Sequence, residues 1–71
     1  MRVTELAEAA DDRDPAVGLA AVAALRDLLE ELEAAHVSNA RAQGWSWEQI
    51  AAALGVRRQS AHRKHARRMV R

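Results

Sequence analysis

The sequence contains no cysteine, only one proline and three glycines, and no aromatic side chains besides two tryptophans. Without cysteine, the chain cannot form disulfides or cysteine-based zinc sites, and it has no glycine-rich phosphate loop. The longest uncharged stretch, Pro15–Leu25, has 11 residues, too few to span a bilayer. Acidic residues interrupt every apolar run near the N-terminus, which argues against a signal peptide. We therefore expect a cytoplasmic protein without a membrane partner.

The chain has only 71 residues, so we expect a single domain. A domain of this size buries only about 60% of the surface that its unfolded chain exposes. Chains below roughly 70–80 residues usually need a disulfide, a metal or a partner. Because cysteine is absent, a partner chain is the leading candidate for the missing stabilisation.

The net charge is only +1, but the two signs are separated along the chain. Residues 1–40 carry nine acidic and three basic side chains, a net charge of −6. Residues 41–71 carry eight basic side chains against Glu48 alone, a net charge of +7. Such asymmetry indicates that the basic half meets a polyanion. The alternative is that the two halves neutralise each other within the fold.

The composition favours helix almost everywhere, because alanine occurs 17 times and β-branched and aromatic residues are few. Apolar residues at helical spacing predict a short helix over Val3–Ala10. Asp14 followed by Pro15 is a strong start signal, an N-cap acid before a proline at the first helical position. From there we expect one long helix to about Gln43, ended by Gly44.

The long helix has more apolar surface than one neighbouring helix needs. A heptad seam and a second stripe beside it consist of Ala21, Leu25, Leu28, Leu32, Ala35 and Asn39, and of Val22, Leu29, His36 and Ala40. We expect two contacts, one with the C-terminal helices and one with a second copy of the chain. The predicted dimer interface is Leu25, Leu28, Leu29, Leu32, Ala35 and His36. The alternative is that Met1–Ala10 folds back and covers the surplus.

The C-terminal residues predict two short helices around a turn. Ser46 and Gln49, three positions apart, form a capping-box pattern at the start of a helix over Trp47–Leu54. Gly55 ends this helix, and a second one is expected over Arg58–Met69. Two helices joined by about three residues with a glycine are typical of a helix-turn-helix. An ordinary helical hairpin is the alternative.

The side chains expected to lie between these two helices are Ile50, Ala51, Leu54, Val56 and Ala61. The fold prediction is thus all-α: a short N-terminal helix, one long helix and a C-terminal helix-turn-helix. Within the single domain 1–71, residues 1–43 are predicted to dimerise through the N-terminal helices, and residues 44–71 to bind DNA.

Residues 45–63, WSWEQIAAALGVRRQSAHR, resemble the pattern G-x-S-W-x-x-I-(A/G)-x-A-L-G-V-S-R-Q-x-A-H of actinobacterial helix-turn-helix DNA-binding proteins. The size and layout of the chain also resemble the small GATC-binding nucleoid-associated (Gbn) type. The resemblance implies DNA binding by the second helix and a homodimer. Arg57 replaces the usual serine N-cap of that helix, at a cost of about 1 kcal/mol, and His65 stands where phenylalanine is common.

The second helix of such a motif lies in the major groove, and its N-terminal residues reach base edges. Arginine pairs with guanine and glutamine with adenine, which favours Arg58, Gln59 and Arg63 as base readers. The full set predicted to contact DNA is Ser46, Trp47, Arg57, Arg58, Gln59, Ser60, His62, Arg63, Lys64 and Arg67. Those expected along phosphates are Lys64, Arg67, Arg68 and Arg71, with Arg41 at a flanking phosphate.

The sequence gives little support to other chemistry. His62 and His65 lack a third metal ligand nearby, and no catalytic constellation is evident, so we expect no metal, cofactor, small-molecule substrate or enzyme activity. We predict a homodimeric nucleoid-associated protein that regulates transcription, reads a short palindromic site in double-stranded DNA and organises or bends it. The alternatives are a repressor with few sites and a protein-interaction adaptor that uses the helix-turn-helix for packing.

Overall fold

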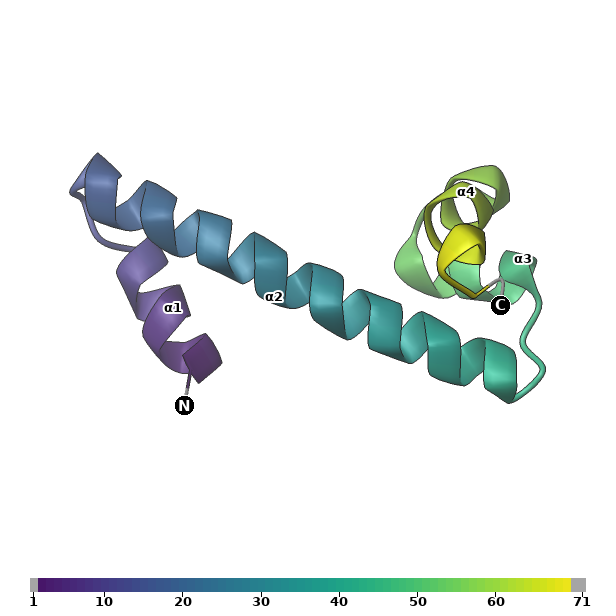
Figure 1. Cartoon of the computed structure of the whole chain (residues 1–71). Helices are drawn as coiled ribbons and strands as arrows, with labels where there is room; N and C mark the ends of the chain where they lie inside the picture. Colours follow the sequence, from purple (N-terminus) through teal and green to yellow (C-terminus); the bar gives the residue numbers. More distant parts are fainter. Residues whose placement is uncertain (1, 70–71) are drawn as a thin grey trace. The chain divides into compact units, whose positions relative to one another are not determined.

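A computed structural model describes residues 2–69, and this range is helical with no strand. Figure 1 shows the four helices, which are α1 (Arg2–Ala10), α2 (Pro15–Ala42), α3 (Trp47–Leu54) and α4 (Arg58–Met69). The all-α prediction is confirmed, and each helix begins and ends within one residue of its predicted boundaries. No helix within this range is both long enough and apolar enough to cross a membrane.

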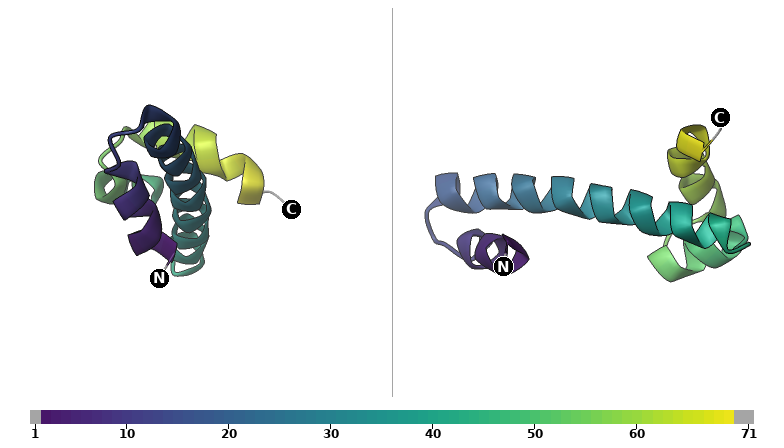
Figure 2. Two further views of the ribbon diagram at one scale, coloured as in Figure 1. Left: turned by 90° about the vertical axis from the view of Figure 1, so that its left-hand side faces the viewer. Right: turned by 60° about the horizontal axis from the view of Figure 1, so that its bottom comes forward.

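The described residues form two compact units, which divide within α2 between Leu32 and Glu33. In the first unit, α1 lies beside the first turns of α2 (Figure 2). The carboxylate of Asp14 accepts a hydrogen bond of 3.0 Å from the Ala16 N–H, which confirms the predicted N-cap. A Cβ on Gly18 would lie 3.3 Å from the Asp12 carbonyl oxygen, so the absence of a side chain permits this close turn.

The second unit contains the end of α2 together with α3 and α4, and two glycines end its helices in the same way. Gly44 has φ 89° and Gly55 has φ 74°. At the end of α3, the N–H groups of Gly55 and Val56 donate to the carbonyls of Ala52 and Ala51, at 3.3 and 3.0 Å. This is a Schellman motif, which needs a left-handed residue. Gly44 closes α2 with the equivalent pair of bonds.

The start of α3 is also formed as expected. The Ser46 hydroxyl accepts a hydrogen bond from the Gln49 N–H at 3.1 Å, and the Gln49 side chain accepts one from the Ser46 N–H at 2.8 Å. The predicted capping box is therefore confirmed. With both ends of α3 fixed by local bonds, the direction in which α4 leaves the turn is set by nearby sequence.

The buried side chains of the second unit are Val37, Ile50, Ala51, Ala61 and His65. Leu54 and Val56 were predicted to face inward, but 39% and 46% of their surfaces are exposed. This prediction was wrong because Leu54 is the last residue of α3 and Val56 lies in the turn after it, where the described residues cover both only in part.

The face of α2 that contacts α3 and α4 also differs from the predicted seam. Val37 is buried, Glu33 bonds to His65, and Arg41 lies against Trp47. Glu33, Val37 and Arg41 are four residues apart and so follow one side of the helix. The C-terminal helices pack on this side, and the seam residue Leu32 remains 45% exposed.

Candidate nucleic-acid interface

The predicted DNA-contacting residues of α4 and the turn before it all lie at the surface. The exposed residues of the predicted set are Ser46, Arg57, Arg58, Gln59, Ser60, His62, Arg63, Lys64 and Arg67, and Trp47 is half-buried. Ala61 and His65 of α4, by contrast, are buried. Arg71 and the Arg68 side chain, both predicted to lie along phosphates, are outside the described residues. Helix α4 thus has one basic, open side and one packed side.

Trp47 links the end of α2 to α4. The guanidinium of Arg41 lies 5.0 Å from the centre of the Trp47 ring, a cation–π distance. The His62 ring meets the same indole edge-on, with centroids 5.2 Å apart and planes at 81°. Arg41 also donates a hydrogen bond of 2.7 Å to the carbonyl of Trp45. Arg41 and His62, both predicted to approach DNA, therefore contact Trp47, and Arg41 also bridges the turn between α2 and α3.

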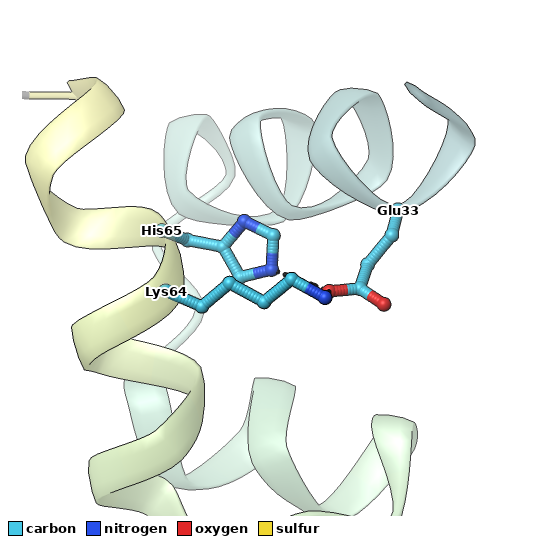
Figure 3. Close-up of polar contacts among 3 residues, drawn as sticks. All are labelled: Glu33, Lys64 and His65. Atoms are coloured by element: carbon cyan, nitrogen blue, oxygen red, sulfur yellow. Dashed lines mark hydrogen bonds and ion pairs between the residues drawn. The ribbon is translucent and has the colours of Figure 1, made fainter. Parts of the chain in front are cut away.

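Glu33 on α2 holds two consecutive residues of α4, as Figure 3 shows. Its Oε2 lies 2.6 Å from His65 Nε2 and 3.1 Å from Lys64 Nζ. A carboxylate only accepts hydrogen bonds, so Nε2 of His65 carries the proton and donates it. His65 Nδ1 is buried and has no hydrogen-bond partner among the described residues.

Two opposing effects act on the pKa of Glu33. Partial burial raises this pKa, whereas the hydrogen bonds and charges of His65 and Lys64 lower it. The lowering effects win, and the pKa of Glu33 lies below its ordinary value of 4.5. At neutral pH, Glu33 is therefore an ionised acceptor for both partners.

Sequence reasoning missed Glu33 as a partner of α4. The contact joins residues 32 positions apart, so no local spacing marks it. The sequence feature that could have indicated this contact is His65, a polar residue where the helix-turn-helix pattern that the sequence resembles often has phenylalanine. The structure places His65 in that packed position, with 1% of its surface exposed, and a buried polar ring requires a hydrogen-bond partner.

Four of the six predicted dimer residues, Leu29, Leu32, Ala35 and His36, are exposed. Within the first unit, Leu29 is 64% exposed, and Leu25 and Leu28 are half-buried. In the second unit, Ala35 and His36 are exposed. Helix α1 does not bury Leu29. The alternative, in which residues 1–10 fold back and cover the apolar residues of α2, therefore accounts for only some of them.

The described residues include no group of three or more histidine, cysteine, aspartate or glutamate side chains that could hold a metal ion. Comparison with known proteins found no matching family model, no matching curated protein and no matching solved structure. The chemistry of the described residues must therefore carry the functional argument.

Proposed function

We propose that this protein binds double-stranded DNA as a homodimer, with α3 and α4 acting as a helix-turn-helix. Helix α4 reads base edges in the major groove. The protein is a nucleoid-associated regulator of transcription of the actinobacterial type that its motif resembles, it acts in the nucleoid, and it organises or bends DNA. Paired motifs about 34 Å apart recognise a short palindromic site.

The observation that carries this proposal is the two-sided character of α4. Its inner side is buried through Ala61 and His65, and Arg58, Gln59 and Arg63 are exposed near its start. Gln59 and Arg63, four residues apart, follow the side away from the buried residues, and Arg58 is exposed at the first position of the helix. These side chains match guanine and adenine in the major groove. The adjacent Arg57, also exposed, provides a cation for the phosphate backbone.

The distribution of charge supports the same function. Residues 41–71 carry a net charge of +7 and residues 1–40 a net charge of −6. The acidic half repels the phosphate backbone, so it orients α4 toward DNA and limits nonspecific attachment elsewhere on the surface.

The homodimer follows from the unused apolar side of α2. The C-terminal helices pack around Val37, and the predicted interface residues Leu29 and Leu32 stay exposed and available to a second copy. Leu29 and Leu32 are 64% and 45% exposed in the single chain. Adjacent exposed leucines on one side of a helix are typical of a protein interface, and a chain of this size benefits from a partner.

Duplex binding measured by fluorescence anisotropy over a series of salt concentrations tests the proposal. Each neutralised phosphate contributes about 0.9 to the slope of log affinity against log salt, so affinity should fall steeply as salt rises. No binding, or binding insensitive to salt, would contradict the proposal.

Three arginine variants separate the proposed roles. Arg58→Ala should reduce the preference for a selected site over random duplex, because a bidentate base contact is lost. Arg67→Ala should weaken binding to all sequences alike, because a phosphate contact is lost. Arg26→Ala, which removes an exposed arginine from α2, is the control and should change neither property. Equal effects of all three would mean that α4 has no special role.

Genome-wide occupancy decides between an architectural protein and a repressor. An architectural protein should occupy thousands of sites and a repressor only a few. For the adaptor alternative, in which the motif serves only for packing, a pull-down on random duplex DNA should recover no protein.

A further inference from the structure

Glu33 makes its contacts with α4 through two residues that follow each other directly in the chain. Its Oε2 accepts a hydrogen bond of 2.6 Å from His65 and forms an ion pair of 3.1 Å with Lys64. Consecutive helical residues project about 100° apart around the helix axis. Two side chains that leave α4 in different directions therefore converge on one oxygen atom of α2 (Figure 3).

This convergence restricts the rotation of α4 about its own axis. Turning α4 one way lengthens the bond from His65, and turning it the other way lengthens the ion pair with Lys64. His65 cannot follow by swinging outward, because only 1% of its side chain is exposed and packed neighbours surround it. Lys64 is longer and 42% exposed, so it is the adaptable half of the pair.

We propose that Glu33 is a positioning residue for DNA recognition, an inference that rests on the proposed function. By holding His65 and Lys64, it sets the rotation of α4 at which Arg58, Gln59 and Arg63 face the bases together. These residues span about one and a half turns of α4 and project in different directions around its axis, so a rotation that improves one base contact worsens another. Glu33 touches no base, and it acts only through the orientation of α4.

The same contact withholds Lys64 from DNA. Sequence reasoning assigned Lys64 to a phosphate, but its Nζ already lies 3.1 Å from a carboxylate oxygen. A phosphate must compete with Glu33 for this cation. Lys64 therefore contributes less to phosphate binding than Arg67, which is exposed on the same helix. Removing the charge of Glu33 removes this competitor for Lys64.

Two variants of Glu33 separate these effects. Glu33→Gln keeps an oxygen that accepts the His65 hydrogen bond but loses the charge that holds Lys64. It should lower the preference for a selected site less than Glu33→Ala does, because the His65 bond remains, and it should steepen the slope of log affinity against log salt by about 0.9 per chain. Glu33→Ala removes both contacts and should also lower the preference at least about fivefold, the equivalent of one bidentate base contact.

The matched control is Glu31→Gln, which removes the same charge from an exposed position on α2. It should leave both the preference and the salt slope unchanged. If Glu31→Gln matches Glu33→Gln, the effect is general repulsion between acidic residues and DNA, and the inference is wrong. A preference that survives in Glu33→Ala overturns it as well. Far-UV circular dichroism and urea unfolding show that each variant tested is folded.

Nitrogen chemical shifts of the His65 ring provide a readout that requires no DNA. The full chain should have the His65 proton on Nε2, Glu33→Ala should lose that strong preference, and Glu31→Gln should keep it. A ring with a proton on Nδ1 and none on Nε2 in the unmodified chain would overturn the inference. If the unmodified chain binds no duplex while the proton is on Nε2, the proposed function has failed. If it binds duplex and Glu33→Ala behaves like the unmodified chain, the positioning role alone has failed.

Discussion

Replacement of Leu29 by alanine tests the dimer at its most exposed predicted contact. Burying a whole leucine side chain is worth about 1.5–3 kcal/mol, and 64% of Leu29 remains exposed in the single chain. Covering that fraction contributes about 1–2 kcal/mol per copy. A symmetric interface contains both copies, so Leu29→Ala should weaken dimerisation by about 2–4 kcal/mol. This corresponds to a rise in the dissociation constant of the dimer of roughly 30-fold to 1,000-fold.

Sedimentation equilibrium over a range of protein concentrations measures that constant. Leu19→Ala is the matched control, because Leu19 lies on the same helix and is 69% exposed. The helical repeat places it about 80° from Leu29, on the side away from Leu25 and Leu32. Alanine favours helix at least as well as leucine, so neither variant should unfold α2. Equal effects of the two variants, or a monomeric unmodified chain, would refute the proposed interface.

The remaining predictions concern stability, and urea unfolding measures each of them. Gly55→Ala should lower the free energy of unfolding by about 1 kcal/mol, because Gly55 has a left-handed φ of 74°. Gly55→Asn should lower it less, since asparagine tolerates this conformation, and equal losses would mean that the backbone conformation is not the cause. Arg57→Ser should stabilise the fold by about 1 kcal/mol through an added N-cap on α4, and an unchanged midpoint would show that the α4 N-terminus is already satisfied. Because the pKa of Glu33 is lowered from 4.5, its ionised form stabilises the fold at higher pH, and this contribution is lost as pH falls through the lowered pKa. The stability difference between the unmodified chain and Glu33→Gln should therefore shrink below pH 4.5, and a difference that is constant down to pH 2 would contradict the assignment.

The helix boundaries could be predicted because their signals are local. The capping box of Ser46 and Gln49 and the left-handed Gly55 involve residues within a few positions of one another. The same holds for Asp14 before Pro15, where the carboxylate caps the first turn of α2. Such bonds depend on sequence spacing alone.

The side of α2 that contacts the C-terminal helices could not be predicted from periodicity. The heptad pattern marks the seam that contains Leu32, but the structure buries Val37 on another side. That choice depends on how α3 and α4 dock, and it is stabilised by Glu33 and His65, 32 positions apart. The burial of Leu54 was wrongly predicted for the same reason, since it depends on a neighbouring side chain that the described residues do not provide.

The short turns on either side of α3 have a consequence for the order of folding. Closing a short loop loses little chain entropy, and fast-folding proteins are rich in such local contacts. We expect α3 and α4 to pair early, since only residues 55–57 separate them. The bond between Glu33 and His65 closes a much longer loop and should form later. Mutations at Glu33 should then accelerate unfolding much more than they slow folding.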